Sequence, residues 1–126
     1  DLDRPAHLNA TREVLACADR ITVMRRGRVA GTLCRAEATE DALVSLMFGT
    51  AAPEVVGRQE QAHPCPAAPL LELSGVETLT DGMAVRLQGV SLKIMPGEIV
   101  GVAGVSGNGQ RALGDVVLGL TRCAKG

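Results

Sequence analysis

A glycine-rich motif near the C-terminal end constrains the fold of this chain more than any other feature. Its glycines have the G-x-x-x-x-G spacing of a phosphate-binding loop, from Gly104 to Gly109. The next two positions, usually lysine and then serine or threonine, are Gln110 and Arg111. The motif therefore predicts a backbone cradle for phosphate that lacks the usual cationic and metal-binding side chains.

The residues on both sides of the motif agree with this prediction. Residues 98–103 form an apolar run that is typical of a buried parallel strand. After the motif, apolar residues recur at helical spacing, at Ala112, Leu113, Val116, Val117 and Leu120. A strand, a glycine-rich loop and a helix in this order direct backbone N–H groups at an anion. A glycine-rich turn that serves packing alone is the structural alternative.

A second phosphate motif overlaps the first. Gly107-x-Gly109-x-x-Ala112 fits the dinucleotide fingerprint G-x-G-x-x-G/A. That fingerprint also needs an acidic residue about 20 positions further on, and the sequence stops at Gly126. The dinucleotide-binding interpretation therefore stays open beside the first.

Composition limits the classes of partner. Of the 126 residues, 46% are hydrophobic and only Phe48 is aromatic, so the core must be aliphatic and stacking on bases has almost no side chains to use. The formal net charge of −1 argues against a nucleic-acid partner. No apolar stretch approaches 18 residues, so no membrane span is expected.

The four cysteines predict neither a metal site nor a disulfide framework. They are widely spaced, form no C-x-x-C pair, and match no zinc-ligand spacing, at Cys17, Cys34, Cys65 and Cys123. Reduced thiols in a cytosolic protein are the simpler interpretation.

Local patterns predict two structured parts and a linker, with an α/β fold. We expect a helix over 11–19, strands over 20–24 and 28–33 joined by a glycine turn, and a helix from Thr39, a plausible N-cap, to Gly49. Residues 50–68 have little apolar periodicity and end Pro-rich, as linkers do.

A new unit begins after that linker. A strand is expected at 70–76, a turn at 78–82 and an alternating strand at 84–94. The candidate core residues of the last strand are Val85, Leu87, Val90, Leu92 and Ile94. The chain thus divides into the tail of one unit (1–49), a linker (50–68) and the head of another (69–126).

At this point the sequence resembles the middle of an ABC importer ATP-binding subunit of the sugar and nucleoside class, in which two nucleotide-binding domains are fused. Residues 12–29 are similar to the end of the first domain, and residues 38–49 to its closing helix. Residues 70–76 and 87–110 are similar to the start of the second domain. The resemblance implies two half-domains of P-loop nucleotide-binding folds, each an incomplete sheet with flanking helices.

The resemblance also implies site residues. The phosphate loop comprises Gly104, Ser106, Gly107, Asn108, Gly109, Gln110 and Arg111, with Gln110 at the place of the phosphate-binding lysine and Arg111 at that of the Mg²⁺-binding hydroxyl. His7 corresponds to the catalytic switch histidine, although six positions separate it from Glu13 where the family has about four. A surface histidine is the alternative for His7.

In the complete protein, the resemblance implies ATP and Mg²⁺ as cofactors. It implies membrane permease subunits and a second nucleotide-binding domain as partners, on the cytoplasmic face of the membrane, with uptake of a solute such as a sugar or nucleoside. This chain shows no glutamine loop, signature run or Walker B strand, so we expect the isolated chain not to hydrolyse ATP. A non-catalytic module that serves as a structural junction or nucleotide clamp is the alternative function.

Overall fold

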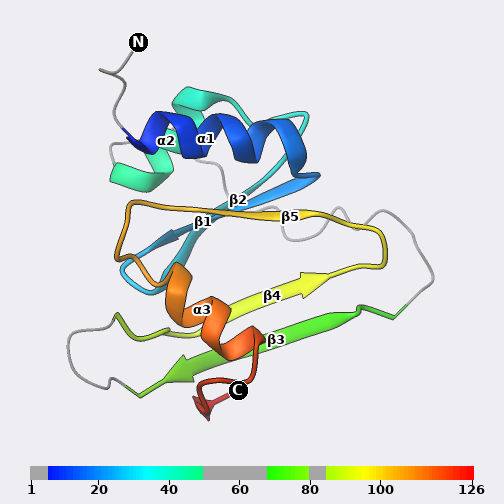
Figure 1. Ribbon diagram of the computed structural model, residues 1–126, viewed down its shortest axis with the longest axis vertical. Helices are drawn as coiled ribbons and strands as arrows, with labels where there is room; N and C mark the ends of the chain where they lie inside the picture. The colour runs from blue at the N-terminus through cyan, green and yellow to red at the C-terminus, as the bar shows by residue number, and fades with distance from the viewer. Residues whose placement is uncertain (1–5, 50–67, 80–84) are drawn as a thin grey trace.

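The computed structural model describes residues 6–49, 68–79 and 85–126, with side chains from residue 11 onward. Helices and strands alternate along the chain, which confirms the predicted α/β class (Figure 1). The elements are α1 (Ala6–Cys17), β1 (Arg20–Arg25), β2 (Arg28–Cys34), α2 (Glu40–Phe48), β3 (Leu71–Thr78), β4 (Val90–Ile94), β5 (Val100–Ala103), α3 (Gln110–Val117) and β6 (Cys123–Lys125).

Strands from both sides of the predicted linker share one sheet. This sheet has the order β2-β1-β5, with β2 antiparallel and β5 parallel to the central β1. The parallel register runs from Arg20 opposite Val100 to Val23 opposite Ala103. The second sheet is antiparallel, in the order β4-β3-β6. The parallel strand expected before the glycine motif is therefore confirmed, but its described partner is a strand of residues 1–49.

The boundaries of the predicted half-domains stay a prediction. Residues 50–67 of the linker lie outside the described residues, as do residues 80–82 of the expected turn at 78–82 and the two residues after it. The described parts on either side nevertheless pack as neighbours, because residues 20–23 of β1 pair with the whole of β5.

Two aliphatic cores lie on opposite faces of the β2-β1-β5 sheet. In Figure 1, α1 and α2 lie on one side of this sheet, and α3, β3 and β4 lie on the other. The core under α1 and α2 contains Ala18, Ile21, Val23, Leu33, Leu43, Met47 and Ala103. The other core contains Met24, Val76, Leu87, Val90, Leu92 and Leu113. Each core thus takes residues from both ends of the chain, so burial of apolar surface couples the two ends.

The ends of the elements follow local chemistry. Thr39 Oγ1 accepts the N–H of Ala42 as the N-cap of α2, which confirms the predicted start. Gly49 ends that helix in the left-handed conformation, at φ 72°. The β1–β2 turn consists of Arg26 at φ 52° and Gly27 at φ 76°, the backbone of a two-residue type I′ hairpin.

Three sequence-based predictions about element lengths were wrong. α1 begins at Ala6, earlier than residue 11, and ends at Cys17. The strand expected over 84–94 is shorter and begins at Val90, because Gly89 at φ 69° interrupts the extended backbone. Leu120 lies beyond the end of α3 and is exposed.

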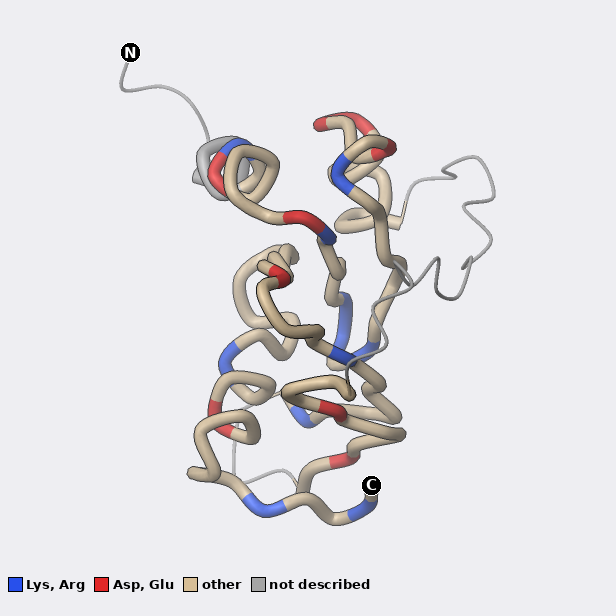
Figure 2. Tube along the Cα trace, turned by 90° about the vertical axis from the view of Figure 1, so that its right-hand side faces the viewer, with Lys and Arg blue, Asp and Glu red and all other residues tan. Residues whose placement is uncertain are grey.

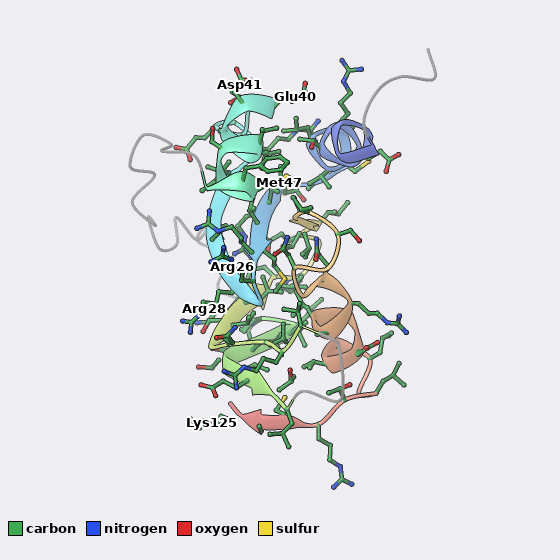
Figure 3. The ribbon with its side chains drawn as sticks, turned by 90° about the vertical axis from the view of Figure 1, so that its left-hand side faces the viewer. Arg26, Arg28, Glu40, Asp41, Met47 and Lys125 are labelled. Atoms are coloured by element: carbon green, nitrogen blue, oxygen red, sulfur yellow. The ribbon has the colours of Figure 1, made fainter. Side chains whose placement is uncertain are left out.

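Charged residues of both signs are interspersed along the described chain (Figure 2). Glu40 and Asp41 occupy the first turn of α2, where acidic side chains favour a helix N-terminus. Arg26 and Arg28 lie at the β1–β2 turn, away from these two carboxylates (Figure 3).

Candidate functional site

The glycine-rich segment joins β5 to α3, in the predicted order of strand, loop and helix. β5 ends at Ala103, the loop runs over residues 104–109, and α3 begins at Gln110 with Gly109 as its N-cap. Gly109 has φ 107° and no side chain, so no N-cap side chain accepts a hydrogen bond from the first turn of α3. This arrangement suits an anion, because the N–H groups of a first helical turn lack intrahelical partners.

Asn108 holds the loop against the β1–β2 turn. Its Oδ1 accepts the N–H of Arg26 at 2.8 Å, and its backbone oxygen accepts the N–H of Gly27 at 3.0 Å. Its Nδ2 donates to the oxygen of Val105 at 2.9 Å within the loop. The loop conformation therefore depends on a turn 82 positions earlier in the sequence.

The side chain of Gln110 folds back into the same loop. Its Oε1 accepts the backbone N–H of Asn108 at 3.2 Å, and its Nε2 donates to the oxygen of Val105 at 3.2 Å. The amide thus bridges two backbone groups of the loop, at the position where the motif usually has a lysine.

Gly104 is needed because the chain approaches it closely. A Cβ at this position would lie 2.6 Å from the oxygen of Met24 and 2.6 Å from Nε2 of Gln110. Neither distance allows a carbon atom, so a larger residue would displace the strand, the amide or both. The first glycine of the motif therefore makes room for neighbours on both sides.

Gln88 holds the other side of the β1–β2 turn. Its backbone N–H donates to the oxygen of Gly27 at 2.9 Å, and its Nε2 donates to the oxygen of Arg26 at 3.0 Å. Sequence reasoning missed the roles of Arg26, Gly27 and Gln88, because the contacts span more than 60 positions and leave no local pattern.

The other predicted site residues are more open. Ser106, Gly107 and Arg111 are exposed at the surface. His7 falls within α1, and its side chain lies outside the described residues, so its role as a switch histidine stays a prediction. A shallow apolar depression of about 200 Å³ borders α3, and its lining includes Gln110 together with Leu92, Val102 and Leu113.

Within the described ranges, no three His, Cys, Asp or Glu side chains gather as a set of metal ligands. None of the described helices is long and apolar enough to cross a membrane.

Comparison with known proteins finds relatives among the import ATP-binding proteins. The chain is 37% identical over 114 residues to a glucose import ATP-binding protein of Haloferax volcanii, and 37% identical over 114 residues to a nucleoside import ATP-binding protein of Lactococcus lactis. It is also 38% identical over 109 residues to a guanosine import ATP-binding protein of Bacillus subtilis. These alignments cover 86% to 90% of the chain. The chain is homologous to a segment of the import ATP-binding proteins.

The resemblance to importer ATP-binding subunits is thereby confirmed. The chain spans about one fifth of the length of these import ATP-binding proteins, with 20%, 22% and 21% of the three relatives covered. No family model matches the chain, and no solved structure matches it. The relatives named for import of sugars and of nucleosides match the chain about equally well, so identity does not separate the two solute classes.

Proposed function

We propose that this chain is the junction segment of an ABC importer ATP-binding subunit and carries the phosphate loop of its second nucleotide-binding domain. The observation that carries the proposal is the β5–loop–α3 unit, in which a parallel strand leads through a glycine-rich loop into a helix N-terminus. The names of the relatives, which describe ATP binding and import, support it.

In this proposal the backbone binds the phosphate. The N–H groups of residues 107–111 follow one another into the first turn of α3, where the helix dipole adds partial positive charge. Because these groups are part of the backbone, the side-chain changes at Gln110 and Arg111 do not remove the N–H donors. They remove the lysine ammonium, which normally contributes a full charge to the phosphates, and the hydroxyl that normally binds Mg²⁺.

The described loop does not fit Mg²⁺. Arg111 stands where the motif usually has a metal-binding hydroxyl, and a guanidinium donates hydrogen bonds but has no acceptor atom for a cation. We therefore assign no Mg²⁺ ligand to this loop. In the complete protein, Mg²⁺ would accompany ATP through ligands elsewhere.

The complete subunit would couple ATP binding and hydrolysis to uptake of a small solute, such as a sugar or nucleoside. It would work beneath membrane permease subunits on the cytoplasmic face, with a second nucleotide-binding domain, and His7 would serve as the switch histidine of the first. Residues 1–126 alone would not turn over ATP, because hydrolysis also needs a group that positions water.

Nucleotide binding by the 126-residue chain tests the loop assignment. The double variant Gln110→Lys with Arg111→Ser restores the sequence G-x-x-x-x-G-K-S. We expect the unmodified chain to bind ATP with a Kd above about 100 µM, and the double variant to bind at least about tenfold more tightly, as measured by calorimetric titration. Adding Gly104→Ala to the double variant is the control, since a Cβ there meets the oxygen of Met24, and it should abolish the gain.

One result would contradict the expected weak binding, and another would contradict the loop assignment itself. Low-micromolar ATP affinity of the unmodified chain would show that the missing lysine is unimportant. Absence of millimolar binding by a folded double variant would show that the loop is a packing turn and not a nucleotide site.

A further inference from the structure

The replacement of lysine by Gln110 changes the hydrogen bonding of the loop as well as its charge. An ammonium group has three donors and no acceptor, so a lysine side chain cannot accept a backbone N–H. A glutamine amide has both, and Gln110 uses both: Oε1 accepts from Asn108 and Nε2 donates to Val105. The substitution therefore supplies the loop with an acceptor of its own.

Asn108 then has a partner for each of its four polar groups. Its N–H is bound by Gln110, its side-chain Nδ2 by Val105, its Oδ1 by Arg26, and its backbone oxygen by Gly27. An entering phosphate oxygen would need the N–H of Asn108, which lies among the successive donors of the loop. That donor is already occupied in the structure, so an anion has to exchange with the amide.

We propose that Gln110 is an internal ligand of the phosphate loop, which an anion must displace before it binds. This inference rests on the proposed nucleotide-binding function and concerns the regulation of that same loop. The Oε1 atom of Gln110 occupies one acceptor position that a polyphosphate oxygen would take. The loop thus favours anionic ligands over neutral ones, because a charge-assisted hydrogen bond is stronger than the neutral one that it replaces.

The neighbours of the amide hold it in place. Gly104 leaves open the space that Nε2 occupies, since a Cβ there would lie 2.6 Å from this atom. The β1–β2 turn holds Asn108 from the opposite side through Arg26 and Gly27, so the N–H of Asn108 stays directed at Gln110. Release of the amide leaves the rest of the loop bonded, and the exchange therefore needs no unfolding.

Substitution of Gln110 by methionine isolates the effect of the amide. Methionine has a similar length and helix propensity but has neither the amide acceptor nor a charge. We expect Gln110→Met in the 126-residue chain to bind inorganic pyrophosphate about fivefold to tenfold more tightly than the unmodified chain, the equivalent of one net hydrogen bond. Gln110→Glu should bind more weakly than the unmodified chain, because a carboxylate fills the same position and repels the anion.

Nuclear magnetic resonance gives a second readout that does not depend on affinity. In the unmodified chain, pyrophosphate should shift the side-chain NH₂ signals of Gln110 as the amide leaves the loop. Without ligand, the backbone N–H of Asn108 should exchange with solvent more slowly in the unmodified chain than in Gln110→Met. Thermal melting followed by circular dichroism establishes that each variant is folded.

The variant Gln110→Lys separates failure of this inference from failure of the proposed function. If Gln110→Lys binds pyrophosphate but Gln110→Met binds no better than the unmodified chain, the loop is a phosphate site and the internal-ligand role is wrong. The same conclusion follows if Asn108 exchanges equally fast in both proteins. If no folded variant binds pyrophosphate or ATP, including Gln110→Lys, the nucleotide-binding function itself is refuted and this inference falls with it.

Discussion

Arg20 and Glu98 form an ion pair beside the parallel strands β1 and β5, with 2.8 Å between Nε of Arg20 and Oε1 of Glu98. Arg20 stands at the start of β1, and Glu98 lies just before β5. Glu98 Oε2 also accepts the N–H of Met95 at 2.9 Å, and Arg20 donates to the backbone oxygen of Lys93. The pair thus connects the parallel strands at the end where β5 begins.

The charge of Glu98 should make the stability of the chain depend on pH. Burial raises the pKa of Glu98, but hydrogen bonds from Arg20 and the N–H of Met95 outweigh it, and the net pKa lies below its ordinary value despite nearby Asp19. The ionised carboxylate therefore stabilises the folded state above the ordinary glutamate pKa of about 4.3, and this contribution is lost as pH falls through the lowered value.

Glu98→Gln should lower the free energy of unfolding by about 1–2 kcal/mol at pH 7, since a charged acceptor becomes neutral. Urea unfolding at pH 7 and at pH 3 checks this prediction. The difference between the two proteins should shrink at pH 3, because this lies below the ordinary glutamate pKa of about 4.3, where the stabilisation by the ionised carboxylate is being lost. A difference that stays constant or grows on acidification would contradict the assigned role.

The packing of α1 on β5 depends on the absence of a side chain at Gly101. A Cβ there would lie 2.5 Å from Cγ1 of Val14 and 3.0 Å from Cβ of Ala18. We expect Gly101→Ala to destabilise the chain by about 1–3 kcal/mol through overpacking, as measured by thermal or urea unfolding. Gly114→Ala is the matched control, because nothing lies within 4 Å of its added Cβ in α3, and it should stabilise by about 0.5–1 kcal/mol. Equal effects of the two substitutions would argue against this contact.

Met24 tests whether the ends of the chain share a core. It belongs to β1, is fully buried, and packs in a cluster whose other buried members come from residues 76–113. Met24→Ala should cost about 2–4 kcal/mol in the free energy of unfolding. The comparison is Leu118→Ala, at a side chain that is 72% exposed, where the cost should be under about 0.5 kcal/mol. A small effect at Met24 would mean that residues 6–49 and 85–126 fold separately.

The N-cap of α2 supports a more local prediction. Thr39→Ala removes the acceptor for the N–H of Ala42 and should cost about 1 kcal/mol. Thr39→Ser keeps the hydroxyl and should cost much less. Both values come from urea unfolding followed by circular dichroism, and a Ser variant as unstable as the Ala variant would mean that the methyl group of Thr39 matters more than its hydroxyl.

Features set by neighbouring residues could be predicted from the sequence. The cap at Thr39, the helix end at Gly49 and the turn at Gly27 each depend on one residue type in one backbone conformation. The order of strand, loop and helix around Gly104 likewise follows from hydrophobic spacing.

Long-range contacts could not be predicted in this way. Nothing in the pattern of Asn108 indicates that Arg26 and Gly27 bind it, because a backbone N–H donor is present at almost every residue. The alternation over residues 84–94 suggests one continuous strand, but the left-handed Gly89 interrupts the extended backbone before β4 begins. The N–H of Leu87 instead donates to Oγ1 of Thr78. The motif assigns Gln110 to the lysine position of the loop, and this assignment stays a prediction, while the direction in which its amide turns depends on three-dimensional packing at Gly104.

The parallel pairing of β1 with β5 has a kinetic consequence. Asp19 and Ile99, which bond where these strands begin, are 80 positions apart, so their meeting requires closure of a very large loop. Hairpin β1–β2 and helix α2 have mostly local contacts and are expected to form early. The three-stranded sheet and both cores form later, because they require contacts between residues that are far apart in the sequence. The refolding rate of this chain should therefore be limited by the pairing of β1 with β5. This rate should rise when the segment between the two strands is shortened.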